Sequence, residues 1–254
     1  MNTGRVHPDK RTSMKHISIT LKRLYPIFII VALFAACKGD EYYTDGGVAN
    51  GKFEGTVVQY LMSKPKEFDS LVQIIKLAGL EETLNNEEVT FFAPTDVNIK
   101  ALIGRLDQGG LNRRLYNEGK DTVKVLGDVD SEIWRKYLLR YVFRGKNKLM
   151  DYPQIDFQQK VIYPGQIYYS LNNSVANIGV VYNDANGIRY MGYRQLHISY
   201  IPDVSRPDDN WATVRISSSD IEPTNGVVHV LEVSGSQLGF NQREMEDEIS
   251  DSKR

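Results

Sequence analysis

The stretch VTFFAPTD, residues 89–96, predicts a strand that turns directly into a helix. Its first five residues are β-branched, aromatic or small, a composition typical of a buried strand. Pro94 ends the strand, because proline has no N–H to donate to a neighbouring strand. Thr95 or Asp96 then accepts hydrogen bonds from the first free N–H groups of a helix over residues 97–106. The stretch therefore predicts one strand, one turn and one capped helix.

Helical spacing of apolar residues predicts further helices on both sides of this unit. Residues 56–62 give a short helical turn, and residues 68–79 give an amphipathic helix. Residues 80–86 give a second short turn before the strand. Ser131 is the expected N-cap of a later helix. The polar, glycine-dotted segment 104–130 is expected to run over the surface as an excursion from the domain.

From residue 155 onward the pattern changes to short β-branched or aromatic runs separated by turn residues. The runs cover residues 161–163, 166–171, 178–182, 188–193, 196–201, 212–217 and 227–233. Asn186–Gly187 lies between two of these runs and is typical of a tight hairpin turn. Helices first and strands later indicate an α+β fold with segregated layers. No internal repeat is visible, which favours a single domain.

Two segments, VTFFAPTD and DIEPTNGVVHVLEV at 220–233, resemble the signature segments of the fasciclin domain family. The resemblance covers residues 56–235 and implies that family's fold, a wedge-shaped β-sandwich with helices packed on one side. It implies a fasciclin-like domain at 53–238, with insertions at 104–130 and 172–213. The residues that match the family's motifs are expected to be structural. They are Phe92, Ala93, Pro94, Thr95, Asp96, Tyr141, Gly145, Asn225, Gly226 and His229.

The central helix departs from the family pattern. Where members carry a Tyr-His or Asn-His pair, this chain has Arg140 and Tyr141, although Gly145 still matches the end of that segment. In animal members the same region is tied to integrin adhesion. The missing histidine means that the resemblance does not extend this kind of adhesion to the present chain.

The second signature segment contains a histidine on a strand. Alternation along Val227–Val233 puts His229 on one face with valine and leucine neighbours. We therefore expect His229 to point inward, to be held by a hydrogen bond and to be structural rather than catalytic. Asn225–Gly226, just before this strand, predicts a turn with positive φ.

The N-terminal region has the features of a targeting signal. Cys37, the single cysteine, directly follows thirteen largely apolar residues, 24–36, and Lys15, Lys22 and Arg23 precede them. A positive start, a short apolar run and small residues before the cleavage point are the features of a secretory signal. The run is shorter than the roughly 20 residues that span a bilayer. The segment resembles a bacterial lipoprotein signal, which implies that Cys37 is acylated.

The second resemblance and the local composition set the remaining boundaries. Residues 1–13 are expected to be an upstream extension, 14–36 the lipoprotein signal peptide and 37–52 a flexible tether. The tail at 239–254 is charged and poor in apolar residues, so it is expected to be disordered. Lysine rather than aspartate after the cysteine predicts the outer membrane, and the acidic residues that follow favour exposure on its outer surface.

Composition excludes several classes of protein. Residues 1–37 hold six Lys and Arg and one Asp, so 25 basic and 31 acidic residues remain beyond them. A mildly acidic chain without a basic stripe is not a nucleic-acid binder. Beyond Cys37 only His197 and His229 are present, too few for a His/Cys metal cluster, and no serine lies in a G-x-S-x-G elbow. We expect no metal, no cofactor and no enzymatic activity.

The leading functional prediction is non-catalytic adhesion or polymer recognition at the cell surface, with a membrane anchor on Cys37 and a protein or glycan ligand outside the cell. One alternative is a glycan-binding accessory lipoprotein of a nutrient-uptake system. There Trp211 would stack on a sugar ring while Asp208 and Asp209 accept hydrogen bonds from its hydroxyls. The second alternative is an extracellular carbohydrate-active enzyme, because two catalytic carboxylates need only meet in space.

Overall fold

The computed structural model describes residues 51–207, 209–233, 238 and 240–253. The described residues belong to one unit, residues 51–254. The expected signal peptide and Cys37 lie outside the described residues, and so does Asp208. Within the described part, no helix has the length and apolar character needed to cross a membrane.

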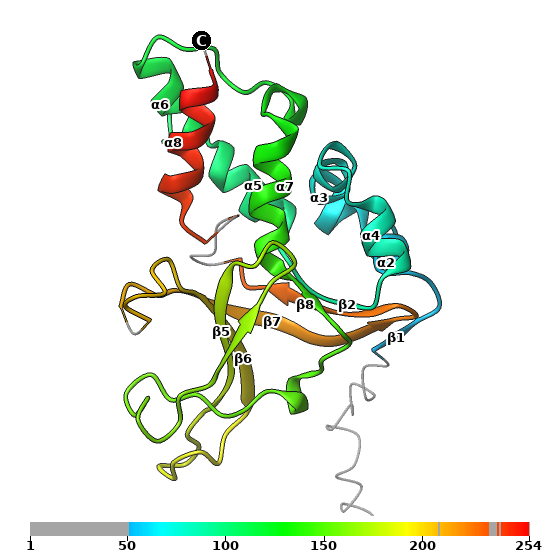
Figure 1. Ribbon diagram of the computed structural model, residues 1–254, viewed down its shortest axis with the longest axis vertical. Helices are drawn as coiled ribbons and strands as arrows, with labels where there is room; N and C mark the ends of the chain where they lie inside the picture. The colour runs from blue at the N-terminus through cyan, green and yellow to red at the C-terminus, as the bar shows by residue number, and fades with distance from the viewer. Residues whose placement is uncertain (1–50, 208, 234–237, 239, 254) are drawn as a thin grey trace, which may run out of the picture. The chain divides into compact units, whose positions relative to one another are not determined.

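This unit combines helices with a mixed β-sheet (Figure 1). The helices are α2 (Val57–Met62), α3 (Pro65–Leu77), α4 (Glu81–Asn86), α5 (Asp96–Ile103), α6 (Leu111–Asn117), α7 (Ser131–Leu138) and α8 (Gln242–Ser252). The 3-10 turns are Leu126–Asp128, Leu139–Tyr141 and Leu149–Asp151. The strands are β1 (Lys52–Phe53), β2 (Val89–Ala93), β3 (Val142–Arg144), β4 (Gln166–Tyr169), β5 (Val175–Tyr182), β6 (Arg194–Tyr200), β7 (Ala212–Pro223) and β8 (Gly226–Leu231).

The strand order is β3-β2-β8-β7-β6-β5-β4, and β1 also pairs with β7. Strands β2 and β8 are parallel neighbours, with Phe92 opposite His229. The two segments that decide the fold are therefore hydrogen-bonded to each other. Every residue of both strands is buried, so each strand is apolar almost throughout instead of alternating with polar residues.

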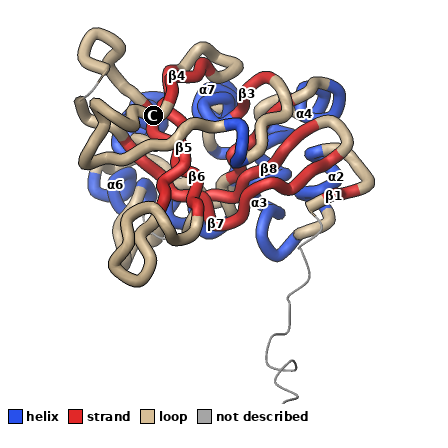
Figure 2. The backbone as a smooth tube through the Cα atoms, turned by 90° about the horizontal axis from the view of Figure 1, so that it is seen from below, coloured by secondary structure: helices blue, strands red, loops and turns tan. Residues whose placement is uncertain are grey.

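Strand β7 joins the two halves of the sheet. Its first part, Ala212–Arg215, pairs with β6, whereas Ile216, Ser218 and Ile221 pair with β8 across two register shifts. Such irregularities bend a strand and increase its twist. Figure 2 shows β7 running from the half formed with β5 and β6 to the half formed with β8.

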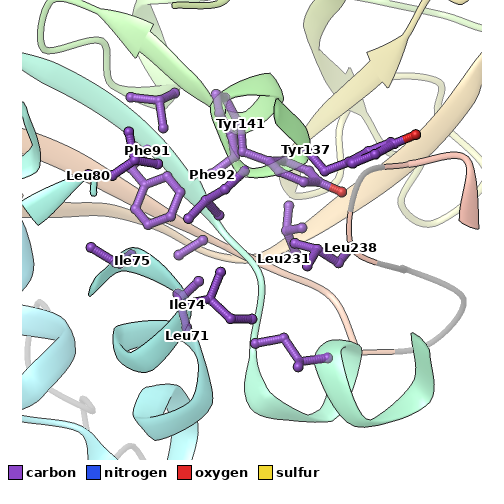
Figure 3. Packing of buried hydrophobic residues seen from close by; sticks show 14 of the residues in the cluster. Leu71, Ile74, Ile75, Leu80, Phe91, Phe92, Tyr137, Tyr141, Leu231 and Leu238 are labelled. Carbon is purple, nitrogen blue, oxygen red and sulfur yellow. The ribbon is translucent and has the colours of Figure 1, made fainter. Parts of the chain in front are cut away.

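The core lies between the helices and the sheet. Leu71 and Ile74 of α3 face Phe92 of β2, and Tyr137 and Tyr141 close the core from α7 and the turn that follows it (Figure 3). Each of these side chains is fully buried. Complete burial of one large apolar side chain contributes about 1.5–3 kcal/mol. The expected α+β class, with helices packed on one side of the strands, is confirmed (Figure 1).

The prediction of a disordered tail at 239–254 is wrong for most of that segment, because Gln242–Ser252 forms helix α8. Met245 and Ile249 are one helical turn apart and fully buried. Charged residues of α8 pair with distant parts of the domain, including Lys136 with Glu248 at 2.6 Å. Two apolar residues with several ion pairs are enough to dock this helix, although they leave only a weak periodic signal in the sequence.

The two expected insertions are also only partly surface excursions. Segment 104–130 contains α6, which buries Leu111 and Leu115. Segment 172–213 contains β5 and β6, which pair along seven residues and carry one half of the sheet.

Three local predictions need correction. Residues 161–163 and 188–193 form turns and loops rather than strands. Asp130, not Ser131, is the N-cap of α7, and its carboxylate accepts a hydrogen bond from the N–H of Glu132 at 2.9 Å.

The tight turn at Asn186–Gly187 is confirmed, since both residues have positive φ and Ala185 pairs with Ile188.

Candidate functional site

The Thr95–Asp96 motif joins two helices. Thr95 is the N-cap of α5, and its N–H donates to Asn98 Oδ1 at 2.7 Å. The Asp96 carboxylate accepts hydrogen bonds from the N–H groups of Ser70 and Leu71, at 2.9 and 3.2 Å. These two N–H groups lie just after the non-helical residue Phe68 inside α3. Asp96 is almost fully buried and therefore holds α3 against the start of α5.

Asn225 connects three separate segments. Its Oδ1 accepts from the N–H of Val57 at 2.9 Å, and its Nδ2 donates to the carbonyls of Leu84 and Glu87 at 3.0 and 2.9 Å. The expected positive φ at Asn225–Gly226 is not found. Gly226 is required for a different reason: a Cβ there would lie 2.5 Å from the carbonyl oxygen of Val89. Close approach of β2 and β8 therefore explains the glycine.

His229 is fully buried and has two backbone partners. The N–H of Asp220 donates to Nδ1 at 3.3 Å, so the ring proton is on Nε2, which lies 3.0 Å from the carbonyl of Asn147. Burial lowers the pKa of His229 to about 4. The neutral ring thus adds stability that is complete above its unfolded pKa of about 6.5 and is lost as the pH falls through about 4. Its role is to hold β8, the end of β7 and residue 147 together.

The place of the family's Tyr-His pair is buried in this chain. Tyr141 is fully buried, its hydroxyl accepts a hydrogen bond from the N–H of Phe240 at 3.0 Å, and the two rings stack at 4.2 Å. Arg140 lies 4.4 Å from the ring centres of both Tyr137 and Tyr200. It also pairs with Glu244 of α8 at 2.7 Å. This segment therefore attaches the C-terminal helix and is not an exposed contact surface.

The loop around Trp211 was expected to bind a sugar, and the structure describes its residues other than Asp208. Trp211 is half-buried, and the Lys160 ammonium lies 3.7 Å from the centre of its ring. Asp209 is exposed. The carboxylate of Asp203 accepts hydrogen bonds from Ser205 and Arg206, which lowers its pKa. A lowered pKa is the opposite of what a glycosidase general acid needs.

Two adjacent loops, 156–165 and 183–193, form an apolar surface that sequence patterns did not predict. The surface consists of the following side chains, with their exposed fractions: Val161 99%, Ile162 64%, Ile188 59%, Met191 67% and Tyr193 67%. We call these five residues the apolar loop surface. In Figure 1 the two loops lie at the opposite end of the view from α6 and α8.

Polar contacts hold the two loops side by side. The Asp156 carboxylate accepts hydrogen bonds from the Tyr190 hydroxyl at 2.9 Å and from Arg189 at 3.2 Å. The rings of Tyr163 and Tyr190 meet at 5.5 Å. The apolar residues of both loops had been interpreted as strand residues. Their flanking turn residues, Asn186–Gly187 and Pro164–Gly165, were the signal that they belong to loops.

The described residues contain no group of three or more His, Cys, Asp or Glu side chains placed to hold a metal ion.

Residues 66–233 match the model of the fasciclin domain. The chain therefore belongs to the fasciclin domain family, whose domains are generally adhesion and matrix-binding modules without catalytic activity. The family match ends before α8, so this helix lies outside the matched region.

Comparison with curated proteins gave no match. Among solved structures, the chain is similar to a FAS1 domain pair from the insect cell adhesion molecule fasciclin I, with a TM-score of 0.44 and 18% sequence identity. The match covers 70% of this chain and 49% of that chain, so the present protein spans about half the length of this neighbour.

Proposed function

We propose that this protein is an envelope-anchored fasciclin-domain lipoprotein that binds a protein or glycan polymer outside the cell, and that the apolar loop surface makes the contact. Acyl chains on Cys37 would supply the membrane affinity, since more than one chain is needed for stable anchoring. Lys38, which follows the cysteine, favours the outer membrane, and the acidic residues at 39–41 favour its outer surface.

The observation that carries the proposal is the exposure of the apolar loop surface. Five large apolar side chains on two neighbouring loops are more than half exposed, and Val161 is 99% exposed. Large apolar side chains exposed together on neighbouring loops favour an interaction site in a folded domain. The loops that carry them are held in place by Asp156, so they present a preformed surface and lose little entropy on binding.

Replacing both Val161 and Ile162 by Asp is expected to lower adhesion of cells or protein-coated beads by roughly tenfold or more, because two charges would have to be desolvated in the contact. The measurement is the fraction of beads, coated with the purified full chain, that stay bound to a surface or to partner cells after washing. Wild-type and variant beads are compared on the same surface. The free energy of unfolding should change by less than about 0.5 kcal/mol, since both side chains are exposed.

The matched control replaces Val125 and Leu106 by Asp. These two residues are 64% and 48% exposed but lie outside the apolar loop surface. The control should adhere as the wild type does. Equal loss of adhesion in both double variants would show that general surface charge, rather than this surface, governs adhesion, and would reject the proposal.

A glycan-binding accessory role remains the second candidate function. Trp211 supports it, because its indole is partly exposed beside two loops that extend from the sheet. In this candidate the protein would present a bound glycan to an uptake system in the same membrane. The third candidate, a carbohydrate-active enzyme, has less support, because the pKa of Asp203 is lowered by its contacts with Ser205.

A further inference from the structure

The half-sheet of β5, β6 and β7 has one apolar face and one polar face. Alternate residues such as Ile178, Ile198 and Val214 belong to the core. The residues between them point to the other side. Strand register places Asn177, Ser199 and Thr213 in one row of that side, and Gly179, His197 and Arg215 in the next. A hydrogen bond of 2.8 Å between the hydroxyls of Ser199 and Thr213 fits this arrangement.

Two side chains of this polar face are buried with polar atoms that lack partners. His197 is 9% exposed and Asn177 4% exposed. Among the described residues, no hydrogen-bond partner is found for either ring nitrogen of His197. The Oδ1 of Asn177 has none either. Leaving a buried polar group unsatisfied costs about 1–3 kcal/mol, so such groups require an explanation. The contrast with His229, whose two nitrogens both have backbone partners, makes His197 unusual within this chain.

The loop 156–165 covers this face. The Phe157 ring lies 5.4 Å from the His197 ring, and the Asn177 Nδ2 donates to the carbonyl of Pro164 at 2.9 Å. Two surface hollows, of about 870 and 320 Å³, are both lined by Phe157 and Gln158. Phe157 is 38% exposed, lines both hollows and has its ring beside the His197 ring, so its side chain lies between these hollows and His197.

An aromatic side chain lies at the edge of the same face. Trp211 has the same strand parity as Thr213 and Arg215, and its ring lies 6.4 Å from Phe157 in an edge-on arrangement. The Lys160 ammonium is 3.7 Å from the ring centre. Phe157 and Lys160 belong to one loop, so displacement of these two side chains, with the loop backbone held in place, uncovers His197 and the Trp211 ring.

We infer that the polar face of β5–β6–β7 is a binding site for a neutral sugar ring of a glycan, with Asn177 and His197 bonding to hydroxyls, Trp211 stacking on the ring, and Phe157 covering the site when it is empty. This inference rests on the proposed recognition function and names the class of its ligand. The sugar ring would then lie on these strands and not against the carboxylates of Asp208 and Asp209, as the sequence had suggested.

The chemistry of these groups favours a neutral polyhydroxyl ligand. A neutral imidazole has one donor and one acceptor nitrogen, and a sugar hydroxyl can serve both. Burial, with a contribution from nearby Arg215, lowers the pKa of His197 to about 4, so the ring is neutral at ordinary pH. Arg215 itself is hydrogen-bonded to Glu232 at 3.1 Å, which balances its charge. The strands of this face therefore offer hydrogen bonds and an aromatic surface, and the charge of Arg215 is balanced within the face. A further cation, Lys160, lies on the covering loop, and its side chain is displaced together with that of Phe157.

The test uses the full chain with Cys37→Ala, which removes the acylation site, and a panel of soluble neutral glycans. Calorimetric titration gives the affinity, and intrinsic fluorescence reports the environment of Trp211, since the other tryptophan, Trp134, is fully buried. We expect one or more glycans to bind and to shift the emission, and we expect no shift in Trp211→Phe. His197→Phe should bind about tenfold more weakly, the loss expected for one or two hydrogen bonds.

Phe157→Ala should have the opposite effect and bind roughly threefold more tightly, because the cover no longer has to be displaced. A purely structural role of His197 would not produce opposite changes in these two variants. Thermal unfolding should show that His197→Phe is at least as stable as the wild type, since an unsatisfied polar group is replaced by an apolar ring.

Three results would overturn the inference: no neutral glycan in the panel binds, His197→Phe binds as tightly as the wild type, or Phe157→Ala binds no better. If Val161 and Ile162 are still required for adhesion while no glycan binds, the proposed function stands and only this inference fails. If adhesion is also independent of those two residues, both fail.

Discussion

A chain that ends at Phe240, and so lacks α8, is expected to be largely unfolded at 37 °C. Arg140 is only 4% exposed and is paired with both carboxylate oxygens of Glu244, at 2.7 and 3.1 Å. Removing one partner of a buried ion pair costs about 3–5 kcal/mol. Loss of Met245 and Ile249 from the core adds about 1.5–3 kcal/mol for each side chain. The sum is comparable to the whole stability of a typical domain, about 5–15 kcal/mol.

Urea unfolding followed by circular dichroism measures this effect. The point variant Glu244→Ala isolates the ion pair and should lower the free energy of unfolding by about 3 kcal/mol. Asp251→Asn, an exposed carboxylate on the same helix, is the control and should change it by less than about 0.5 kcal/mol. A truncated chain as stable as the wild type would show that α8 is dispensable.

Asn225→Ala is expected to destabilise the domain by about 3 kcal/mol. The substitution removes three hydrogen bonds to backbone groups of Val57, Leu84 and Glu87, each worth about 0.5–1.5 kcal/mol. Asn225→Asp should be at least as harmful. It keeps the acceptor for Val57 but turns a carboxylate oxygen toward two carbonyl oxygens.

The unfolding free energy of these variants is compared with that of Asn117→Ala, in which an exposed asparagine is removed. The control should differ from the wild type by less than about 0.5 kcal/mol. If Asn225→Ala were equally mild, the motif asparagine would not hold α2, α4 and β8 together, and our account of the second signature segment would be incorrect.

These features show which parts of the fold local sequence could predict. The strand and capped helix around 89–96 were predictable, because strand composition, Pro94 and the Thr95 cap all act within eight residues. Helix α8 was not predictable in the same way. Its stability depends on Arg140, about a hundred residues earlier in the chain, and its own sequence contains few apolar residues.

The candidate site follows the same division. Trp211 was singled out from the sequence as a residue on a loop, but its contact with Lys160 depends on a loop fifty residues earlier. The role of Asn225 could not be derived from turn propensity, because its partner Val57 is 168 residues away. His197 gave no signal at all. Only strand register and burial reveal that its ring nitrogens have no partners.

The central claim is that a fasciclin domain anchored to the membrane through Cys37 binds a ligand outside the cell. Replacing Cys37 by Ser in the full chain tests it most directly, because the substitution removes the thiol that we propose is acylated and leaves residues 51–254 unchanged. Cells producing this variant are fractionated, labelled with a fatty acid and assayed for adhesion. Our account predicts no acyl label, release of the protein from the membrane fraction and loss of adhesion. A variant that stays in the membrane fraction and supports wild-type adhesion would contradict it.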